Sequence, residues 1–222
     1  MCLFLLILLS AYSFFIWNGD AVKPVFLDNG ISCLVIDAGH GGIDGGAIGI
    51  NGMKESAINL DIALKLQAIA SLFGEKTVMT RVDDSMRTDA LSYSEHEDLV
   101  HRTEIINNTA NAVLISIHQN CYPTGQPSGA QVMYAKSNGS ELLGKMMHDS
   151  IIDKLEPDNR RVAEPASEKL YITSHVNCPA VLVECGFMSN FSDLEKLGNN
   201  DYQIQLSAVM FASYMDFISN YS

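Results

Sequence analysis

The segment from Cys33 to Ser56, CLVIDAGHGGIDGGAIGINGMKES, decides how the rest of the chain is interpreted. Its apolar opening, Cys33–Ala38, predicts a buried strand. His40 follows directly, and a glycine-rich loop continues to Met53. Two kinds of site use such a loop, because glycine lets the backbone approach a ligand without a Cβ clash: a phosphate cradle and a metal site.

The phosphate cradle is disfavoured by the spacing of the glycines. A dinucleotide site needs G-x-G-x-x-G at the start of a helix. Gly39 and Gly41 fit this pattern, but Asp44 stands at the third glycine position, and no G-K-[ST] follows. The loop also continues to Met53 before a helix begins, so no helix N-terminus is expected near Gly41.

Outward from this segment, apolar runs alternate with helical periodicity. Such alternation predicts an α/β fold of three α/β/α layers, with a twisted, mostly parallel sheet and the site at the carboxyl edge of the strands. The expected strands are Cys33–Ala38, Thr77–Arg81, Ala112–His118, Gly129–Ala135, Lys169–Thr173 and Ala180–Glu184. The expected helices are Ser56–Phe73, Glu95–Asn108, Ser140–Leu155 and Tyr202–Tyr221.

Polar side chains follow several of these strands. His40, His118 and Glu184 stand at strand ends, as does Arg81, and Glu55 can fold back from the far end of the glycine loop. A catalytic zinc site takes three N or O ligands and keeps one position for water, and a nearby carboxylate can act as its base. Two histidines and two glutamates therefore predict a metal site. Residue chemistry alone leaves open which glutamate binds the metal, and also whether the histidines are only hydrogen-bonded structural residues.

Several motifs, taken together, resemble the zinc-dependent N-acetylmuramoyl-L-alanine amidases of the amidase-3 type. They are DAGHGGIDGGAIG (Asp37–Gly49), KES (Lys54–Ser56), TR (Thr80–Arg81), HRTEIIN (His101–Asn107), SIHQN (Ser116–Asn120) and PAVLVECGFMSN (Pro179–Asn190). The resemblance covers Cys33 to Tyr221. It implies one Zn²⁺ per chain held by His40, Glu55 and His118, with Glu184 as the catalytic glutamate.

The resemblance also implies a reaction and a biological setting. The enzyme would hydrolyse the amide between the lactyl group of N-acetylmuramic acid and L-alanine of the peptidoglycan stem. The chain is most similar to the sporulation branch, whose members act on spore cortex. It departs from the family where Ser174 and His175 follow LYIT, at a position that often carries arginine. A zinc peptidase of stem peptides and a catalytically silent wall-binding module remain alternatives.

The first residues, Met1–Trp17, are uncharged and largely apolar. We expect residues 1–19 to be a membrane anchor or an export signal, and 28–222 to be one catalytic domain; a buried element of the fold is the third alternative. Export would place the enzyme outside the cytoplasmic membrane, in the cell wall or the cortex space. The net charge of −12 disfavours nucleic acid as a partner. The resemblance implies peptidoglycan as the partner. A need for a protein activator is left open.

Other residues carry weaker expectations. His96, His101 and His148 are expected on solvated helix faces, and Arg102 in an ion pair with a neighbouring acid. Cys33, Cys178 and Cys185 are expected as small core side chains, since the five cysteines show no spacing pattern. The proline-containing segment Pro157–Glu168 is expected to form no helix that could cover the site.

Overall fold

The computed structural model describes residues 32–84 and 94–221. Within these ranges six strands form one sheet in the order β2-β1-β3-β6-β4-β5. They are β1 (Cys33–Ala38), β2 (Thr77–Met79), β3 (Ala112–Asn120), β4 (Gln131–Tyr134), β5 (Glu164–Pro165) and β6 (Ala180–Phe187). Neighbouring strands run parallel except β4 and β6, which are antiparallel. The expected mostly parallel sheet is confirmed.

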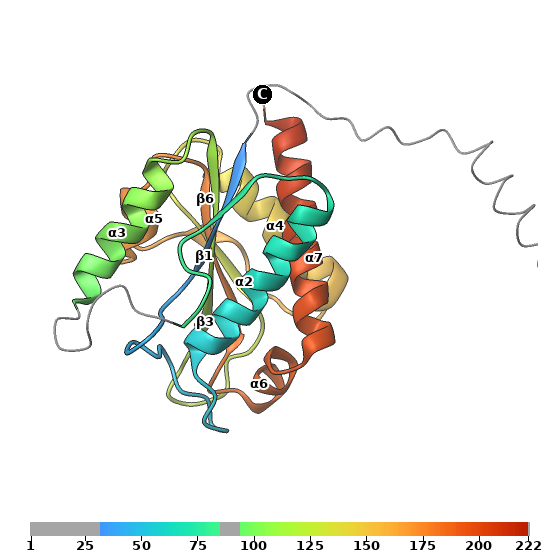
Figure 1. Cartoon of the computed structure of the whole chain (residues 1–222). Helices are drawn as coiled ribbons and strands as arrows, with labels where there is room; N and C mark the ends of the chain where they lie inside the picture. Colours follow the sequence, from blue (N-terminus) through green and yellow to red (C-terminus); the bar gives the residue numbers. More distant parts are fainter. Residues whose placement is uncertain (1–31, 85–93, 222) are drawn as a thin grey trace, which may run out of the picture. The chain divides into compact units, whose positions relative to one another are not determined.

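Helices cover both faces of this sheet, which confirms the three-layer α/β/α architecture (Figure 1). One face carries α2 (Glu55–Leu72), α4 (Ser140–Leu155) and α7 (Asn200–Asn220); the other carries α3 (Glu95–Asn107) and the short α5 (Tyr171–His175). A further short helix, α6 (Phe191–Leu197), follows β6 and was not expected. Among the described residues, no helix combines the length and the apolar character needed to cross a bilayer.

Helix α2 shows why the sequence folds as predicted. Its apolar residues recur at helical spacing, and Ile58, Ile62 and Leu66 are almost completely buried against the sheet. The helix ends at Leu72. Gly74, two residues further on, has a φ of +76° and donates its N–H to the carbonyl oxygen of Ser71. Glycine adopts that conformation without a Cβ penalty and is the common residue just beyond a helix C-terminus.

The face covered by α3 and α5 has a smaller apolar core that lies near the amino ends of the strands. It includes Val35, Leu114, Ile172 and Ala180. Because side chains alternate along a strand, the residues that share this face farther on are Asp37, Ser116, His118 and Glu184. This face therefore changes from apolar to polar as the strands reach their carboxyl edge.

One expected strand is wrong. The sequence predicts a strand at Lys169–Thr173, but the overlapping segment Tyr171–His175 forms the helix α5. Both edges of β6 are already occupied by β3 and β4, so this segment has no place beside it in the sheet. Ile172 instead packs with Val176 in the smaller core. A short run such as LYIT fits a strand or a helix turn equally well by periodicity.

The expectations for the segment Pro157–Glu168 and for the N-terminal segment have different outcomes. Between Pro157 and Glu168 the structure has only the two-residue strand β5 and no helix, as expected. The N-terminal segment 1–19 lies outside the described residues.

Candidate metal centre

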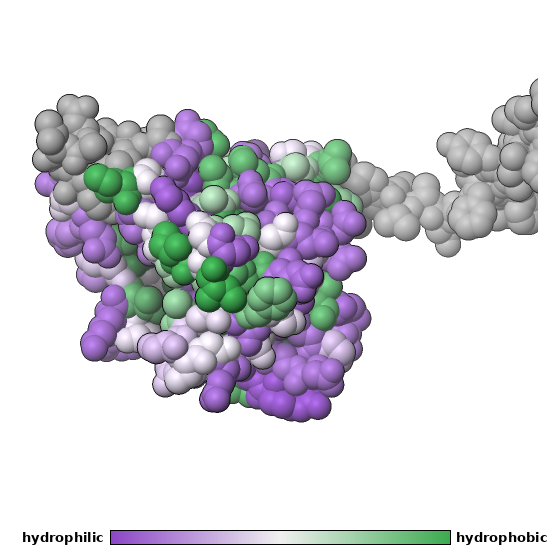
Figure 2. Space-filling view, turned by 90° about the horizontal axis from the view of Figure 1, so that it is seen from below, coloured by the Kyte–Doolittle hydropathy of each residue, from purple (hydrophilic) through white to green (hydrophobic). Residues whose placement is uncertain are grey.

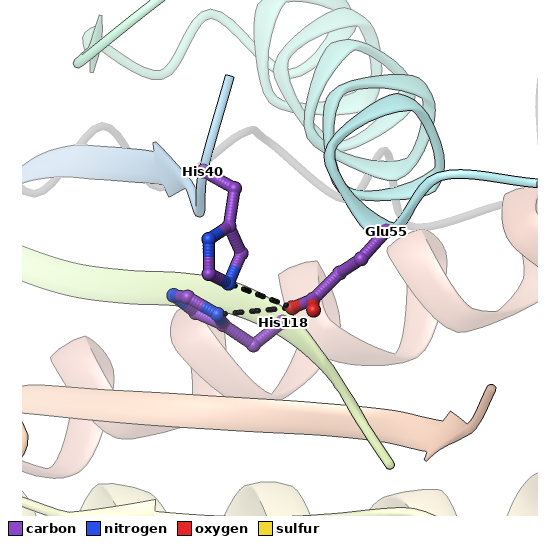
Figure 3. A group of neighbouring side chains, drawn as sticks. All are labelled: His40, Glu55 and His118. Carbon is purple, nitrogen blue, oxygen red and sulfur yellow. Dashed lines mark hydrogen bonds and ion pairs between the residues drawn. The ribbon is translucent and has the colours of Figure 1, made fainter. Parts of the chain in front are cut away.

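Three side chains that can bind a metal meet at the carboxyl edge of the sheet (Figure 3). His40 lies in the loop after β1, Glu55 is the first residue of α2, and His118 lies near the end of β3. Glu55 Oε1 is 3.3 Å from His40 Nε2 and 3.2 Å from His118 Nδ1. The three donor atoms lie within 4.8 Å of one another. The predicted convergence of these residues is observed.

The glycine loop returns to the sheet and so delivers Glu55. Two antiparallel bridges, Gly41 with Asp44 and Ile48 with Lys54, fold the loop back on itself. The carboxylate of Glu55 then accepts the Ala47 N–H on Oε2 and the Gln119 N–H on Oε1, at 2.9 and 3.0 Å. These two backbone donors hold the carboxylate of Glu55 in its orientation toward the two histidines.

Two glycines are required by the close packing around these ligands. A Cβ on Gly39 would lie 2.2 Å from the imidazole of His118. A Cβ on Gly46 would lie 2.7 Å from Glu55 Oε2 and 2.8 Å from the ring of His40, and its φ of +63° also favours glycine. Gly46 therefore lets the backbone approach the site without a Cβ clash, as expected from the sequence, and Gly39 does the same.

The backbone of His40 is held in a conformation that is unusual for a side-chain-bearing residue. Its φ is +61°, in the left-handed region. Such conformations cost energy and persist only where the surroundings hold them. Asp44 Oδ2 lies 2.7 Å from His40 Nδ1, which leaves Nε2 facing Glu55. An acceptor on one ring nitrogen that orients the other is the usual arrangement for a metal-binding histidine.

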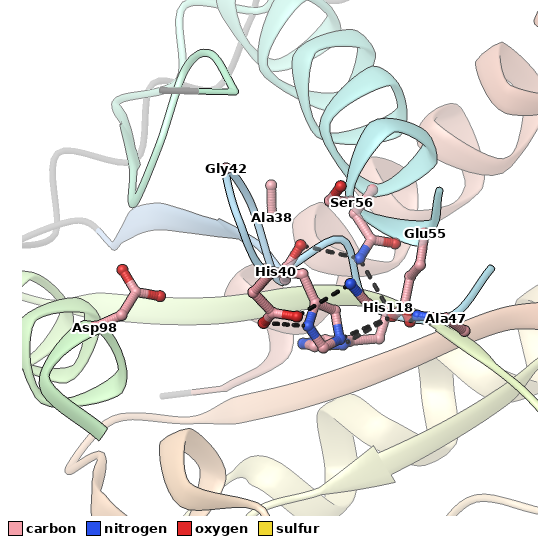
Figure 4. A network of polar contacts seen from close by, with 12 residues as sticks. Ala38, His40, Gly42, Ala47, Glu55, Ser56, Asp98 and His118 are labelled. Carbon is pink, nitrogen blue, oxygen red and sulfur yellow. Dashed lines mark hydrogen bonds and ion pairs between the residues drawn. The ribbon is translucent and has the colours of Figure 1, made fainter. Parts of the chain in front are cut away.

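Arginines hold the end of β1 from two directions. Arg102 on α3 donates to Asp37 Oδ1 and to the carbonyl oxygens of Ala38 and His40, at 3.0, 2.7 and 2.6 Å. Arg81 donates to the carbonyls of Ala38, Gly39 and Ser56. Arg102 also pairs with Asp98, so the expected helix ion pair is confirmed. In the view of Figure 4, His40 lies between Asp98 on α3 and Glu55 on α2.

Charges around the site are strongly coupled. Burial disfavours the charged form of Glu55, but hydrogen bonds to His118 and His40 outweigh it and lower the pKa of Glu55 far below its usual value. Burial likewise lowers the pKa of His40, yet hydrogen bonds to Glu55 and Asp44 raise it to about 9. The charged forms of His40 and Glu55 thus stabilise each other.

Glu184 is the second carboxylate of this edge. It lies beside His118 in the register of β3 and β6, and it faces the same side of the sheet. Its Oε2 is buried and has no hydrogen-bond partner among the residues that the structure describes. Burial raises the pKa of Glu184 to about 7. An unpartnered buried carboxylate oxygen is costly in a folded protein and indicates a ligand or a reacting group.

The residues fit a divalent metal of the zinc type. Two imidazoles and one carboxylate are the ligand types of catalytic zinc sites, which leave a fourth position for water or substrate. The side chains of His40 and His118 are 27% and 20% exposed, so their edge is reachable from solvent. Among the described residues, this is the one group of three such side chains close enough to share an ion.

The other candidate residues lie elsewhere. His96 is exposed, and His175 is exposed on α5 with its ring stacked on Tyr171 at 4.0 Å. Cys33 and Cys185 are buried as expected, whereas Cys178 is only partly buried. The expectation that His148 is solvated is wrong, because it is 2% exposed. Its position, four residues after Gly144 and three before Ile151, puts it on the buried face of α4, and this helical spacing is a signal that could have identified it.

Apolar side chains surround the site on the loops of the carboxyl edge. Figure 2, seen from below relative to Figure 1, shows hydrophobic patches between polar side chains on this face. The exposed apolar residues in these loops include Ile43, Ile48, Ile50, Val82, Tyr122 and Val162, and Phe191 is exposed at the start of α6. The site therefore lies at an edge of the sheet whose surface is partly apolar.

Comparisons with known proteins agree on a family. Residues 34–213 match the amidase-3 family model, described as N-acetylmuramoyl-L-alanine amidase. The germination-specific N-acetylmuramoyl-L-alanine amidase of Bacillus subtilis is 30% identical over 219 residues, which cover 96% of this chain and 91% of that protein.

Two solved structures are also similar. The CwlD amidase of Clostridioides difficile, solved in complex with the GerS lipoprotein, superposes with a TM-score of 0.79 at 31% identity, over 84% of this chain and 98% of that chain. An N-acetylmuramoyl-L-alanine amidase of Clostridium difficile 630 gives a TM-score of 0.77 at 27% identity, over 87% of this chain and 100% of that chain.

Proposed function

The chain belongs to the amidase-3 family of N-acetylmuramoyl-L-alanine amidases, and we propose that it carries out this hydrolysis with one zinc ion held by His40, Glu55 and His118. It is an enzyme of peptidoglycan, and the bond that defines this class joins the lactyl carbonyl of N-acetylmuramic acid to the nitrogen of L-alanine. The observation that carries the proposal is the convergence of three donor atoms beside Glu184, whose buried Oε2 has no hydrogen-bond partner in the described part of the chain.

Each residue has a definite role in this proposal. Zinc at such a site lowers the pKa of a water and polarises a carbonyl oxygen. Glu184 removes a proton from the attacking water, whose oxygen forms a bond to the carbonyl carbon. Glu184 then returns that proton to the nitrogen of L-alanine as the C–N bond breaks. The raised pKa of Glu184, caused by burial, suits a group that must both accept and donate a proton near neutral pH.

Zinc content and product chemistry test this proposal together. Purified His118→Ala protein should lose zinc and activity, whereas His175→Ala, which changes an exposed histidine outside the site, should keep both. Mass spectrometry of digested peptidoglycan should show stem peptides with a free L-alanine N-terminus. Products in which the lactyl amide is intact and a stem-peptide bond is cut would identify a peptidase instead.

We extend the proposal to spore cortex as the substrate. Its support is the similarity to the germination-specific amidase and to the CwlD amidase. Deleting the gene should yield spores whose cortex lacks muramic lactam, which forms only after the peptide is removed. Normal muramic lactam in such spores would place the enzyme in vegetative wall metabolism. The CwlD amidase was solved with a lipoprotein, and a protein partner for this chain is proposed on that basis.

The hydrophobic segment 1–19 is proposed as an anchor or export signal, which would place the site outside the cytoplasmic membrane. Deleting residues 1–19 should then leave a soluble protein with the zinc content and turnover of the full chain. Aggregation or unfolding of the truncated protein would mean that the segment belongs to the fold.

A further inference from the structure

A row of polar residues crosses the sheet next to the candidate metal centre. The register pairs His118 on β3 with Glu184 on β6, and Glu184 with Gln131 on β4. Directly paired residues of neighbouring strands share one face of a sheet, about 4.8 Å apart. The row therefore begins at a candidate metal ligand, passes the candidate base and continues toward the edge formed by β4 and β5.

Arg161 ends this row. Its Nη1 donates to Gln131 Oε1 at 3.0 Å, and its Nε donates to the carbonyl of Ser128 at 3.2 Å. The guanidinium carbon lies 4.7 Å from the ring centroid of Phe187, which follows Glu184 by three residues on β6. A stacked guanidinium with two fixed donors has little conformational freedom left to lose when it binds a ligand.

The backbone of Arg161 is fixed as well. Its N–H donates to Asn159 Oδ1 at 3.0 Å, and its carbonyl oxygen accepts from His148 Nε2 at 2.9 Å. His148 is the buried histidine of α4, so a residue of the helical layer holds the loop that carries the arginine. Both the backbone and the partly exposed side chain of Arg161 are therefore held by hydrogen bonds.

Arg161 nevertheless pairs with no carboxylate among the described residues. The chain has 26 acidic and 14 basic residues, so acidic partners are not scarce. The buried Arg102, by contrast, pairs with two carboxylates. A guanidinium that is fixed by neutral oxygens and an aromatic ring keeps a donor edge for an anionic ligand, and its planar fork matches a carboxylate.

We propose that Arg161 binds a free carboxylate of the peptidoglycan stem peptide, on the residue that follows L-alanine. This inference rests on the proposed amidase function. The stem then runs from the candidate metal ligands over Glu184 toward the edge of β4. One to two strand spacings, about 5–10 Å, separate Glu184 from the end of the row. An extended peptide covers that distance in two to three residues at roughly 3.3–3.6 Å each. The proposal requires a stem whose second residue carries a free carboxylate, as a glutamate joined through its side chain does.

A purely structural role for Arg161 makes a different prediction. If Arg161 only fastens the loop to β4, its loss weakens the cleavage of every substrate alike. If it binds the carboxylate, its loss matters only where that carboxylate is present. Two synthetic peptidoglycan fragments separate the roles: one with the free carboxylate on the second stem residue, and one with a carboxamide there.

The experiment compares kcat and KM of the zinc-loaded wild type and of Arg161→Gln on both fragments. A charge-assisted hydrogen-bonded pair is typically worth about tenfold or more in binding. The wild type should therefore favour the carboxylate fragment about tenfold or more, with the difference in KM. Arg161→Gln should lose that preference and cleave the carboxamide fragment as the wild type does. Arg161→Lys should regain part of the preference, since it keeps the charge without the fork.

Arg160→Gln is the matched control. Arg160 is exposed on the same loop, and its Nη1 donates to the carbonyl of Pro157. It should keep the wild-type preference. Equal losses of Arg161→Gln on both fragments, or a wild type without preference, would overturn the inference while leaving the amidase function intact. Failure of the zinc-loaded wild type to cleave either fragment or wall peptidoglycan would overturn the proposed function, and this inference with it.

Discussion

The Nη2 of Arg102 donates a 2.6 Å hydrogen bond to the carbonyl oxygen of His40, a residue whose φ is +61°. Arg102 is 5% exposed, and its guanidinium also contacts Asp37, which is completely buried. Burial raises the pKa of Asp37, but Arg102 outweighs it and holds that pKa below its usual range. The charge pair that stabilises the end of β1 thus also holds the backbone of a candidate metal ligand.

We expect Arg102→Gln to destabilise the protein by about 3–5 kcal/mol, because it leaves the buried charge of Asp37 without its partner. Denaturant unfolding of the metal-free protein measures this change. The control is Asp98→Asn, which removes only the partly exposed partner of Arg102 and should cost about 1 kcal/mol or less. Equal effects of the two variants would contradict the importance of the buried pair.

Gly39→Ala tests the packing around the ligands. The added Cβ would lie 2.2 Å from the ring of His118, so the imidazole must leave its present position beside Glu55. We expect zinc affinity to fall by about tenfold or more, as for other changes next to metal ligands. Gly198→Ala is the control, since its φ is −80° and an added Cβ would meet no atom closer than 3.4 Å. A competition titration with a chelating dye measures both, and wild-type affinity of Gly39→Ala would refute this explanation of the glycine.

Glu156 predicts a pH dependence of stability away from the metal. It accepts from the Ala130 N–H, Lys196 and Tyr202, at 2.7, 2.7 and 3.0 Å. Burial raises the pKa of Glu156, but the bonds to Lys196 and Ala130 outweigh it and lower that pKa. A lowered folded-state pKa stabilises the protein above the unfolded-state pKa, near 4.3, and the contribution is lost as pH falls through the folded-state pKa.

The stability difference between wild type and Glu156→Gln should therefore be largest near neutral pH and shrink below about pH 4.3. Urea unfolding at several pH values, with a chelator present so that metal binding does not contribute, measures it. A difference that stays constant, or grows, as the solution is acidified would show that the charge of Glu156 does not stabilise the fold.

The sequence was most informative where local pattern and topology agree. Apolar strands alternating with helices predicted the sheet, and the rule that parallel strands end at one edge brought His40, His118 and Glu184 together. Residue chemistry could not assign Glu55 as the ligand, because that depends on how the glycine loop folds back. The family resemblance supplied that assignment, which remains a proposal here.

The misses have physical causes. The helix at Tyr171–His175 was predicted as a strand because five residues carry too little periodicity, and the sheet had no free edge beside β6 for it. The contacts of Arg102 with the carbonyl oxygens of Ala38 and His40, and the position of Arg161, depend on tertiary register between segments far apart in sequence. No spacing within the sequence encodes such contacts.

The central claim is that the metal group and Glu184 form one hydrolytic site. The most direct measurement is the zinc content and the turnover of Glu184→Gln, with peptidoglycan products followed by mass spectrometry. Glutamine keeps the shape of the side chain but cannot accept a proton, so we expect one zinc per chain and a turnover that falls by about 10²-fold or more. Near-normal release of stems with a free L-alanine N-terminus by the zinc-loaded variant would contradict this account.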